Sequence, residues 1–133
     1  MKMLLDTNIC IYVTKRKPVS VREKFLSLDF ADVGVSSITV AELEYGVYKS
    51  QQREKNQEAL NEFLRFLQIL PYDEKAAKVY AKVGRELEIK GQVISPMDTL
   101  IASHAISLGV TLVTNNVREF SIISDLVWEN WVE

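Results

Sequence analysis

Residues 2–8 of the chain read Lys-Met-Leu-Leu-Asp-Thr-Asn, an apolar stretch that ends abruptly in three polar residues. The apolar part, Lys2–Leu5, predicts a short buried strand. The side chains that follow it, beginning with Asp6, are of the types that cap helices, and they predict a turn into a first helix over roughly Ile9–Thr14. The chain therefore opens with a strand, a carboxylate at the end of that strand, and a helix.

The same alternation continues to the end of the sequence. Short apolar runs predict further strands at residues 32–36, 69–70 and 110–114 and near 127–128. Helical spacing of apolar residues predicts helices from Pro18, from Thr39, over about 60–67, over 74–89 and over 96–108, the last capped by Ser95 and ended by Gly109. This pattern predicts an α/β fold in a single domain, residues 1–133, with a short, mostly parallel central sheet flanked by helices.

Three carboxylates, Asp6, Glu42 and Asp98, stand near predicted helix starts. Ligands of parallel sheets bind outside the carboxyl ends of the strands, so these acids are expected to converge there. Clustered carboxylates repel one another unless a cation neutralises them, and Mg²⁺ or Mn²⁺ is the hard cation that suits oxygen ligands. Helix capping is the competing explanation for each acid, because Thr39 with Glu42 and Ser95 with Asp98 have the spacing of capping boxes.

The overall composition excludes several function classes. The net charge of −2 and the pI near 5.5 are not those of a protein that coats nucleic acid through its overall charge. Cys10 is the only cysteine, in an apolar setting typical of a packed thiol, and His104 is the only histidine, so a zinc site or a nucleophile–histidine relay is not expected. The chain shows no signal-peptide core and no membrane span, and we expect a cytoplasmic protein.

Two basic clusters are candidates for phosphate contacts. Lys15, Arg16 and Lys17 follow the first predicted helix and are expected to reach phosphates beside Asp6. A second set recurs at helical spacing: Lys75, Lys78, Lys82 and Arg85. A solvated face explains either set equally well. A third set of residues is suited to base stacking, although tyrosines at helical spacing more often belong to a core or an interface: Tyr12, Tyr45 and Tyr48.

Four ordered stretches of the chain resemble the motifs of PIN-domain ribonucleases. They are Met3–Asn8 (MLLDTN), Ser36–Leu43 (SSITVAEL), Pro96–Ala102 (PMDTLIA) and Leu112–Phe120 (LVTNNVREF). They span nearly the whole chain, within a length typical of the VapC toxins of bacterial toxin–antitoxin pairs. Four motifs in order make a far more specific signal than any one of them.

The resemblance implies a PIN fold and a Mg²⁺-dependent endoribonuclease, with Mn²⁺ as a substitute ion, that hydrolyses phosphodiester bonds of structured RNA, especially tRNA, through a metal-activated water. By position, Asp6, Glu42 and Asp98 match the metal-binding acids of the family. Asn116 and Glu119 are both candidates for the fourth site position, with Glu119 assisting indirectly and Asn116 orienting water or ligand. The resemblance implies a VapB-type antitoxin as a protein partner, and we expect the chain to form a homodimer. A housekeeping RNA-processing nuclease and a non-enzymatic PIN-fold interaction module are the alternatives.

Overall fold

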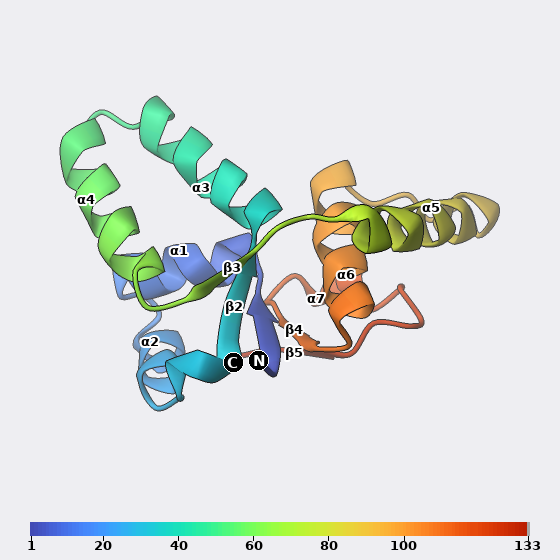
Figure 1. Cartoon of the computed structure of the whole chain (residues 1–133), viewed down its shortest axis with the longest axis horizontal. Helices are drawn as coiled ribbons and strands as arrows, with labels where there is room; N and C mark the ends of the chain where they lie inside the picture. Colours follow the sequence, from blue (N-terminus) through green and yellow to red (C-terminus); the bar gives the residue numbers. More distant parts are fainter. Residues whose placement is uncertain (133) are drawn as a thin grey trace.

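The computed structural model of the chain describes residues 1–132. A five-stranded sheet forms its centre, with the strand order β3-β2-β1-β4-β5 (Figure 1). The strands are β1 (Met3–Leu5), β2 (Val33–Ser36), β3 (Gln68–Leu70), β4 (Thr111–Val113) and β5 (Trp128–Glu129). Every pair of neighbours runs parallel, which confirms the predicted parallel α/β sheet.

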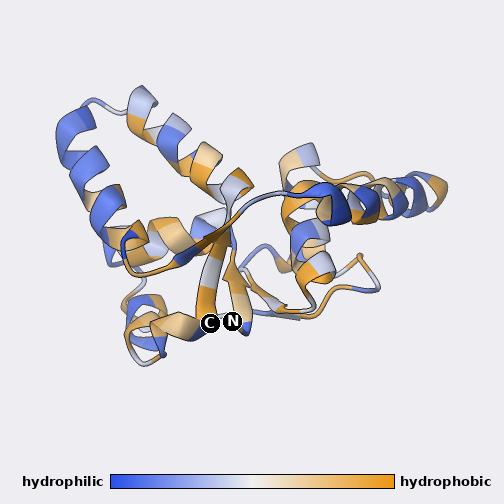
Figure 2. Ribbon diagram, in the orientation of Figure 1, coloured by the Kyte–Doolittle hydropathy of each residue, from blue (hydrophilic) through white to orange (hydrophobic). Residues whose placement is uncertain are grey.

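Helices cover both faces of this sheet. They are α1 (Thr7–Lys15), α2 (Val19–Leu26), α3 (Ser37–Lys49), α4 (Arg53–Leu64), α5 (Glu74–Ile89), α6 (Pro96–Leu108) and α7 (Val117–Phe120), with a 3-10 turn at Phe30–Asp32. Figure 1 shows α1 to α4 on one side of the sheet and α5 to α7 on the other. Hydrophilic residues line the outer faces of α4 and α5, while the strands and α6 are largely hydrophobic (Figure 2). Across residues 1–132, no helix combines the length and the apolarity that a membrane crossing requires.

Alternating strand side chains build two separate cores. Leu4 and Leu112 belong to the core that α5 and α6 cover, whereas Leu5 and Val113 belong to the core beneath α1 to α4. This division follows from the period of two along a strand. The strands also pack closely at Gly34, where an added Cβ would lie 2.8 Å from the Leu70 Cδ2. Both faces of the short sheet are therefore buried, and only its edges and strand ends are open to a ligand.

The capping box predicted at Thr39 and Glu42 is wrong. The cap of α3 is Ser36, whose hydroxyl oxygen accepts a hydrogen bond from the Ile38 N–H at 3.1 Å. Thr39 is buried inside the helix, and Glu42 lies in its second turn. The first helix is also longer than predicted, because Asp6 itself is its cap.

The chain changes direction across the sheet between β1 and β4. From β1 it proceeds to β2 and β3 on one side, and it returns to place β4 on the other side of β1. In open parallel sheets, ligands bind beyond the carboxyl ends of the strands at such a switch point. Asp6 and Thr114 are the residues that follow β1 and β4 directly. The topology therefore predicts a ligand site at Asp6 and Thr114.

Candidate functional site

Asp6 and Thr114 lie side by side at this switch point. Asp6 Oδ1 accepts a hydrogen bond from the Thr7 N–H at 2.7 Å, which caps α1. Asp6 Oδ2 accepts a hydrogen bond from the Thr114 hydroxyl at 2.8 Å. The Asp6 N–H in turn donates to the Val113 carbonyl at 2.9 Å, which keeps the two strand ends in register. Asp6 is only 3% exposed, and the bonds from Thr7 and Thr114 hold its two carboxylate oxygens in place.

Glu42 reaches the same edge from the second turn of α3. Its Oε1 accepts a hydrogen bond from the Thr7 hydroxyl at 2.6 Å, and the Thr39 hydroxyl lies 3.3 Å from that of Thr7. Thr7 therefore connects two acids, because its backbone N–H donates to Asp6 and its side chain donates to Glu42. Since Glu42 lies beyond the first turn, the capping explanation does not apply to it.

Asp98 and Glu119 are joined by Asn116. Ser95 caps α6 by accepting a hydrogen bond from the Asp98 N–H at 3.2 Å, so the backbone of Asp98 serves the cap. Its side chain serves a different contact, because Asp98 Oδ2 accepts a hydrogen bond from Asn116 Nδ2 at 3.4 Å. The same nitrogen donates to Glu119 Oε2 at 3.2 Å. One amide group thus holds two carboxylates.

Burial and neighbouring carboxylates raise the pKa values of two acids in this cluster, Asp6 and Asp98. Burial raises the pKa of Asp6, and the charges of Glu42 and Glu119 raise it further, against the lowering effect of its two hydrogen bonds. Burial raises the pKa of Asp98 to about 8, followed by a hydrogen bond with Glu119 and by the charges of Asp6, Glu119 and Glu42. These four carboxyl groups, from four separate segments of the chain, therefore interact electrostatically at one edge of the sheet.

The chemistry of this cluster suits a hard divalent cation. All its charged groups are oxygen donors, and a cation among them would relieve the repulsion that raises the pKa of Asp98. Within residues 1–132, no group of three or more acidic, histidine or cysteine side chains is arranged, as it stands, to hold a metal ion. Mg²⁺ does not need one, because it keeps several of its waters and is commonly held through one or two carboxylates. The cluster is therefore a candidate centre for Mg²⁺ or Mn²⁺.

The basic cluster Lys15–Lys17 lies elsewhere. Asp6 caps the first turn of α1, and the cluster begins at the last residue of this nine-residue helix, which is about 13 Å long. The three side chains are exposed, and Arg16 ends the helix in a left-handed conformation with φ of 62°. The structure thus places these side chains at the opposite end of α1 from Asp6, and their contact with phosphate stays a prediction that requires an RNA spanning this helix.

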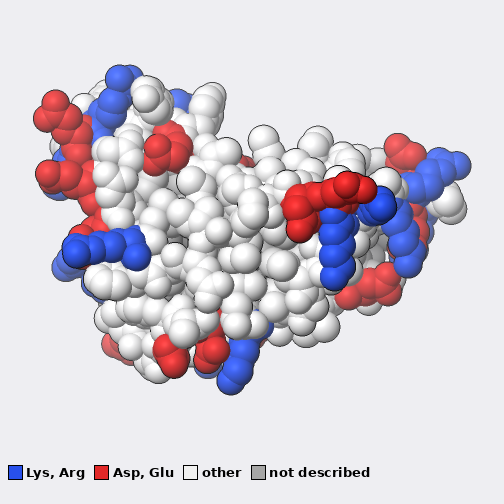
Figure 3. Space-filling view, in the orientation of Figure 1, with Lys and Arg blue, Asp and Glu red and all other residues white. Residues whose placement is uncertain are grey.

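The basic stripe of α5 is largely neutralised by acids. Lys78 pairs with Glu74 at 3.3 Å and Arg85 pairs with Glu88 at 3.2 Å. Lys82 also lies 3.9 Å from the Asp125 carboxylate. Figure 3 shows acidic and basic side chains mixed along both α4 and α5. A solvated helix face explains this stripe.

The remaining candidates have other roles in the structure. Tyr45 and Tyr48 are exposed, and each lies beneath a cation, Lys49 at 5.3 Å and Arg53 at 4.6 Å from the ring centroids. Tyr12 accepts a hydrogen bond from Asn115 at 2.9 Å. Cys10 is fully buried, and burial raises the pKa of its thiol, which agrees with a packed, unreactive cysteine.

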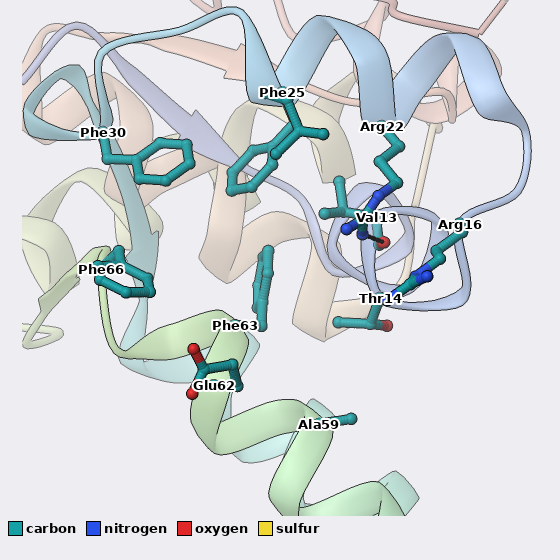
Figure 4. A pocket seen from close by; sticks show the side chains of 11 residues that line it. Val13, Thr14, Arg16, Arg22, Phe25, Phe30, Ala59, Glu62, Phe63 and Phe66 are labelled. Carbon is teal, nitrogen blue, oxygen red and sulfur yellow. Dashed lines mark hydrogen bonds between the residues drawn. The ribbon is translucent and has the colours of Figure 1, made fainter.

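A second feature is an apolar groove between the α1–α2 pair and α4 (Figure 4). We call it the aromatic groove after its four phenylalanines, Phe25, Phe30, Phe63 and Phe66. Their ring centroids are 4.9 to 6.2 Å apart in successive pairs. The groove encloses a cavity of about 290 Å³, and Arg16 and Arg22 lie at one end of it. Arg22 also donates a hydrogen bond to the Val13 carbonyl at 2.9 Å, which fixes its position beside α1.

Comparison with known proteins establishes the family. The PIN domain family matches residues 3–126. The chain belongs to the PIN-domain family. Among the PIN-domain proteins similar to it, the ribonuclease VapC2 of Rickettsia felis is 45% identical over 129 residues, covering 96% of both chains. The tRNA(fMet)-specific endonuclease VapC of Shigella flexneri is 43% identical over 131 residues, covering 98% of both.

A solved structure shows the same relationship. The crystal structure of VapBC2 from Rickettsia felis, bound to a DNA fragment from its promoter, matches this PIN domain with a TM-score of 0.92 at 43% identity. The match covers 99% of this chain and 100% of the other. These likenesses confirm the resemblance to VapC ribonucleases that the four sequence motifs indicate. They establish the family and the fold, and the roles of individual residues rest on the geometry.

Sequence reasoning missed the two threonine hydroxyl groups that hold Glu42 and Asp6. Thr7 shows as a capping residue in the sequence, but its bond to Glu42 spans 35 positions and has no local signal. Thr114 binds Asp6 across 108 positions. The parallel pairing of β1 with β4 is the only feature that could have indicated this contact, because it places the residues after both strands together.

Proposed function

We propose that this chain is the toxin of a type II toxin–antitoxin pair and acts as a metal-dependent endoribonuclease on structured RNA, with tRNA as the first candidate substrate. The observation that carries the proposal is the convergence of Asp6, Glu42, Asp98 and Glu119 from four segments of a PIN fold. Similar proteins are named ribonuclease and tRNA(fMet)-specific endonuclease, which supports this class of substrate. We expect the reaction to take place in the cytoplasm, within the single domain of residues 1–133.

In this proposal Asp6, Glu42 and Asp98 hold Mg²⁺, and Mn²⁺ can substitute for it. The bound ion would supply the positive charge that activates a water and stabilises negative charge on the phosphate. Thr7 holds the Glu42 carboxylate, and Thr114 holds that of Asp6, so these acids need not reorganise when the cation arrives.

The fourth position is divided between two residues. In this proposal Glu119 would take up a proton from the attacking water, directly or through a second water. Asn116 Nδ2 orients Glu119 and Asp98 together through its two hydrogen bonds. We therefore assign the acid–base role to Glu119 and the orienting role to Asn116.

We further propose that a VapB-type antitoxin binds in the aromatic groove. The groove is mainly apolar and open between helices, with Arg16 and Arg22 at one end and Glu62 on α4 (Figure 4). Its apolar lining suits the apolar face of an amphipathic helix, and its arginine end suits an acidic residue of that helix. A basic side chain of the same partner, extending to the carboxylates, would compete with the cation. A similar protein has been crystallised as a VapBC assembly, which supports a partner of this kind.

A second copy of the chain is the other proposed partner. Figure 3 shows a central area without charged side chains over β3 and the segment that joins it to α5. β3 is an edge strand, and Ile69 within it is 48% exposed. Uncharged edges of this kind are suited to association. Light scattering of the purified chain at micromolar concentration is expected to give the mass of a dimer.

Cleavage of a total small-RNA pool by the purified protein tests the proposed activity. Discrete fragments are expected with Mg²⁺ or Mn²⁺, and their loss with EDTA or in Asp6→Asn would support a metal-dependent nuclease. Growth arrest on expression, relieved by a small co-encoded protein, separates a toxin from a housekeeping RNA-processing nuclease. A folded protein that binds neither Mg²⁺ nor Mn²⁺ and cleaves nothing would be a non-enzymatic interaction module.

A further inference from the structure

A buried polar pair lies behind the carboxylates and touches none of them. His104 Nδ1 lies 2.7 Å from Ser36 Oγ. His104 is 1% exposed and Ser36 is fully buried. The two residues are 68 positions apart, and the contact joins α6 to the junction of β2 and α3. These are the helices that carry Asp98 and Glu42, respectively.

The same junction is held by a third segment. The Tyr72 ring meets the His104 imidazole edge-on, with centroids 5.1 Å apart. The Tyr72 N–H donates to Ser37 Oγ at 3.0 Å. Ser36 and Ser37, the cap and the first residue of α3, are thus each fixed by a contact from another segment. The start of α3 therefore has little freedom to move relative to α6.

The direction of the hydrogen bond follows from the partners of Ser36. Its oxygen already accepts from the Ile38 N–H at 3.1 Å. Its hydroxyl proton is buried and needs an acceptor, and the Nδ1 of His104 is the acceptor that the structure supplies. In this direction of the bond His104 is neutral, with its ring proton on Nε2, whereas the other tautomer would leave the Ser36 hydroxyl proton without this acceptor. Burial lowers the pKa of His104, against the opposing charge of Asp73, which favours the same neutral form.

We propose that neutral His104 is a positioning residue: by accepting the Ser36 hydroxyl proton at Nδ1, it fixes the spacing between the helix that carries Asp98 and the helix that carries Glu42. The effect on cation binding rests on the function proposed above. The tether itself does not, because it is a property of the fold without a cation. Loss of the tether would let the two acids separate and weaken their joint hold on a divalent ion.

The first test is the state of the ring. His104 is the only histidine, so its ring ¹⁵N resonances are unambiguous. At neutral pH the spectrum is expected to show a proton on Nε2 and none on Nδ1. A proton on Nδ1, whether in the other neutral form or in the imidazolium ion, would overturn the assignment.

The second test compares His104→Leu, which has no acceptor, with His104→Asn, whose amide oxygen is bonded to Cγ as Nδ1 is. Mn²⁺ affinity of the folded variants is measured by electron paramagnetic resonance. His104→Leu is expected to bind about 10-fold more weakly, the lower end of the loss caused by removing an outer-shell partner, and His104→Asn to recover most of that loss. Ser107→Ala is the matched control, because its buried hydroxyl bonds only the carbonyl of His104 within α6.

The third test needs no metal. Spin labels at Tyr45→Cys on α3 and Met97→Cys on α6 occupy exposed positions, and Cys10 is buried. The distance distribution between the labels is expected to broaden or shift in His104→Leu and to stay unchanged in His104→Asn and Ser107→Ala. A folded His104→Leu protein with the parent distribution, or an equal change in Ser107→Ala, would overturn the proposal. If the parent protein binds no Mn²⁺, the proposed function fails, but the label distances still test whether the bond between His104 and Ser36 fixes the spacing of the two helices.

Discussion

The carboxylate edge, which comprises Asp6, Glu42, Asp98 and Glu119, and the aromatic groove are built in opposite ways. At the edge, each acid is held by a directed hydrogen bond at a strand end or a helix start, as Asp6 is by Thr114. In the groove, phenylalanines pack by shape alone, and Phe66 remains 56% exposed. The edge is polar and pre-oriented, which suits a cation and a phosphate. The groove is apolar and open, which suits a protein partner, so catalysis and neutralisation should be separable by mutation.

The largest expected effect is at the edge. Asp98→Asn should reduce RNA cleavage by about 100-fold or more, because it removes a charge from the proposed metal centre. Its fold should remain, since the cap of α6 uses the Asp98 backbone N–H rather than its carboxylate. The matched control is Ser95→Ala, which should cost about 1 kcal/mol of stability as a lost cap and keep its cleavage. Cleavage lost in Ser95→Ala and retained in Asp98→Asn would show that these residues serve only to start the helix.

The next effect is at the groove. Phe66→Ser should weaken antitoxin binding by about 30-fold, the effect of losing an aromatic anchor worth about 2 kcal/mol, and leave cleavage unchanged. Calorimetry with the purified antitoxin measures the affinity. Val93→Ser is the control, because Val93 is an exposed apolar residue that does not line the groove. Equal affinities for Phe66→Ser and Val93→Ser would place the antitoxin on another surface.

A smaller effect is expected from Thr7, whose hydrogen bonds link Asp6 and Glu42. Thr7→Val keeps the shape of the side chain and the backbone bond to Asp6 but removes the hydroxyl that holds Glu42. Cleavage at limiting Mg²⁺ should fall by about 10-fold and recover in part as Mg²⁺ is raised. Thr14→Val is the control, since that hydroxyl bonds the Ile11 carbonyl within its own helix. A Thr7→Val enzyme with the parent Mg²⁺ dependence would show that Glu42 needs no such support.

The last effect concerns stability without metal. Burial and neighbouring carboxylates raise the folded-state pKa of Asp98 to about 8 from an ordinary value of 3.8. Between these values the folded state binds more protons than the unfolded state, so the stability of the parent protein should fall as pH rises from 4 to 8. In EDTA, Asp98→Asn should therefore unfold at a higher temperature than the parent at pH 8 and show little advantage near pH 4. If the stability difference between the parent protein and Asp98→Asn is the same at both pH values, then burial and the neighbouring acids do not raise the pKa of Asp98.

The sequence predicts the edge better than the groove for a physical reason. Strands and caps are local, so Asp6 after β1 and Ser95 before Asp98 could be recognised from a few neighbouring residues. The parallel sheet then brings strand ends together without further information. Cross-chain bonds such as that from Thr7 to Glu42 have no local signature.

The groove has even less local signature. Phe25 lies in α2, Phe30 in a 3-10 turn, Phe63 near the end of α4, and Phe66 beyond that helix. Only the docking of α4 against α1 and α2 brings these rings together. The distance of Lys15–Lys17 from Asp6 also depends on more than closeness in sequence, because the whole of α1 lies between them.

The central claim is that Asp6, Glu42 and Asp98 form one divalent-cation centre. A Mn²⁺ titration followed by electron paramagnetic resonance, comparing the parent protein with Asp98→Asn, tests it most directly. The parent protein should show saturable binding that Mg²⁺ displaces, and the variant should bind at least about 10-fold more weakly while remaining folded. Equal Mn²⁺ binding by the parent and the variant, or none by either, would contradict the claim.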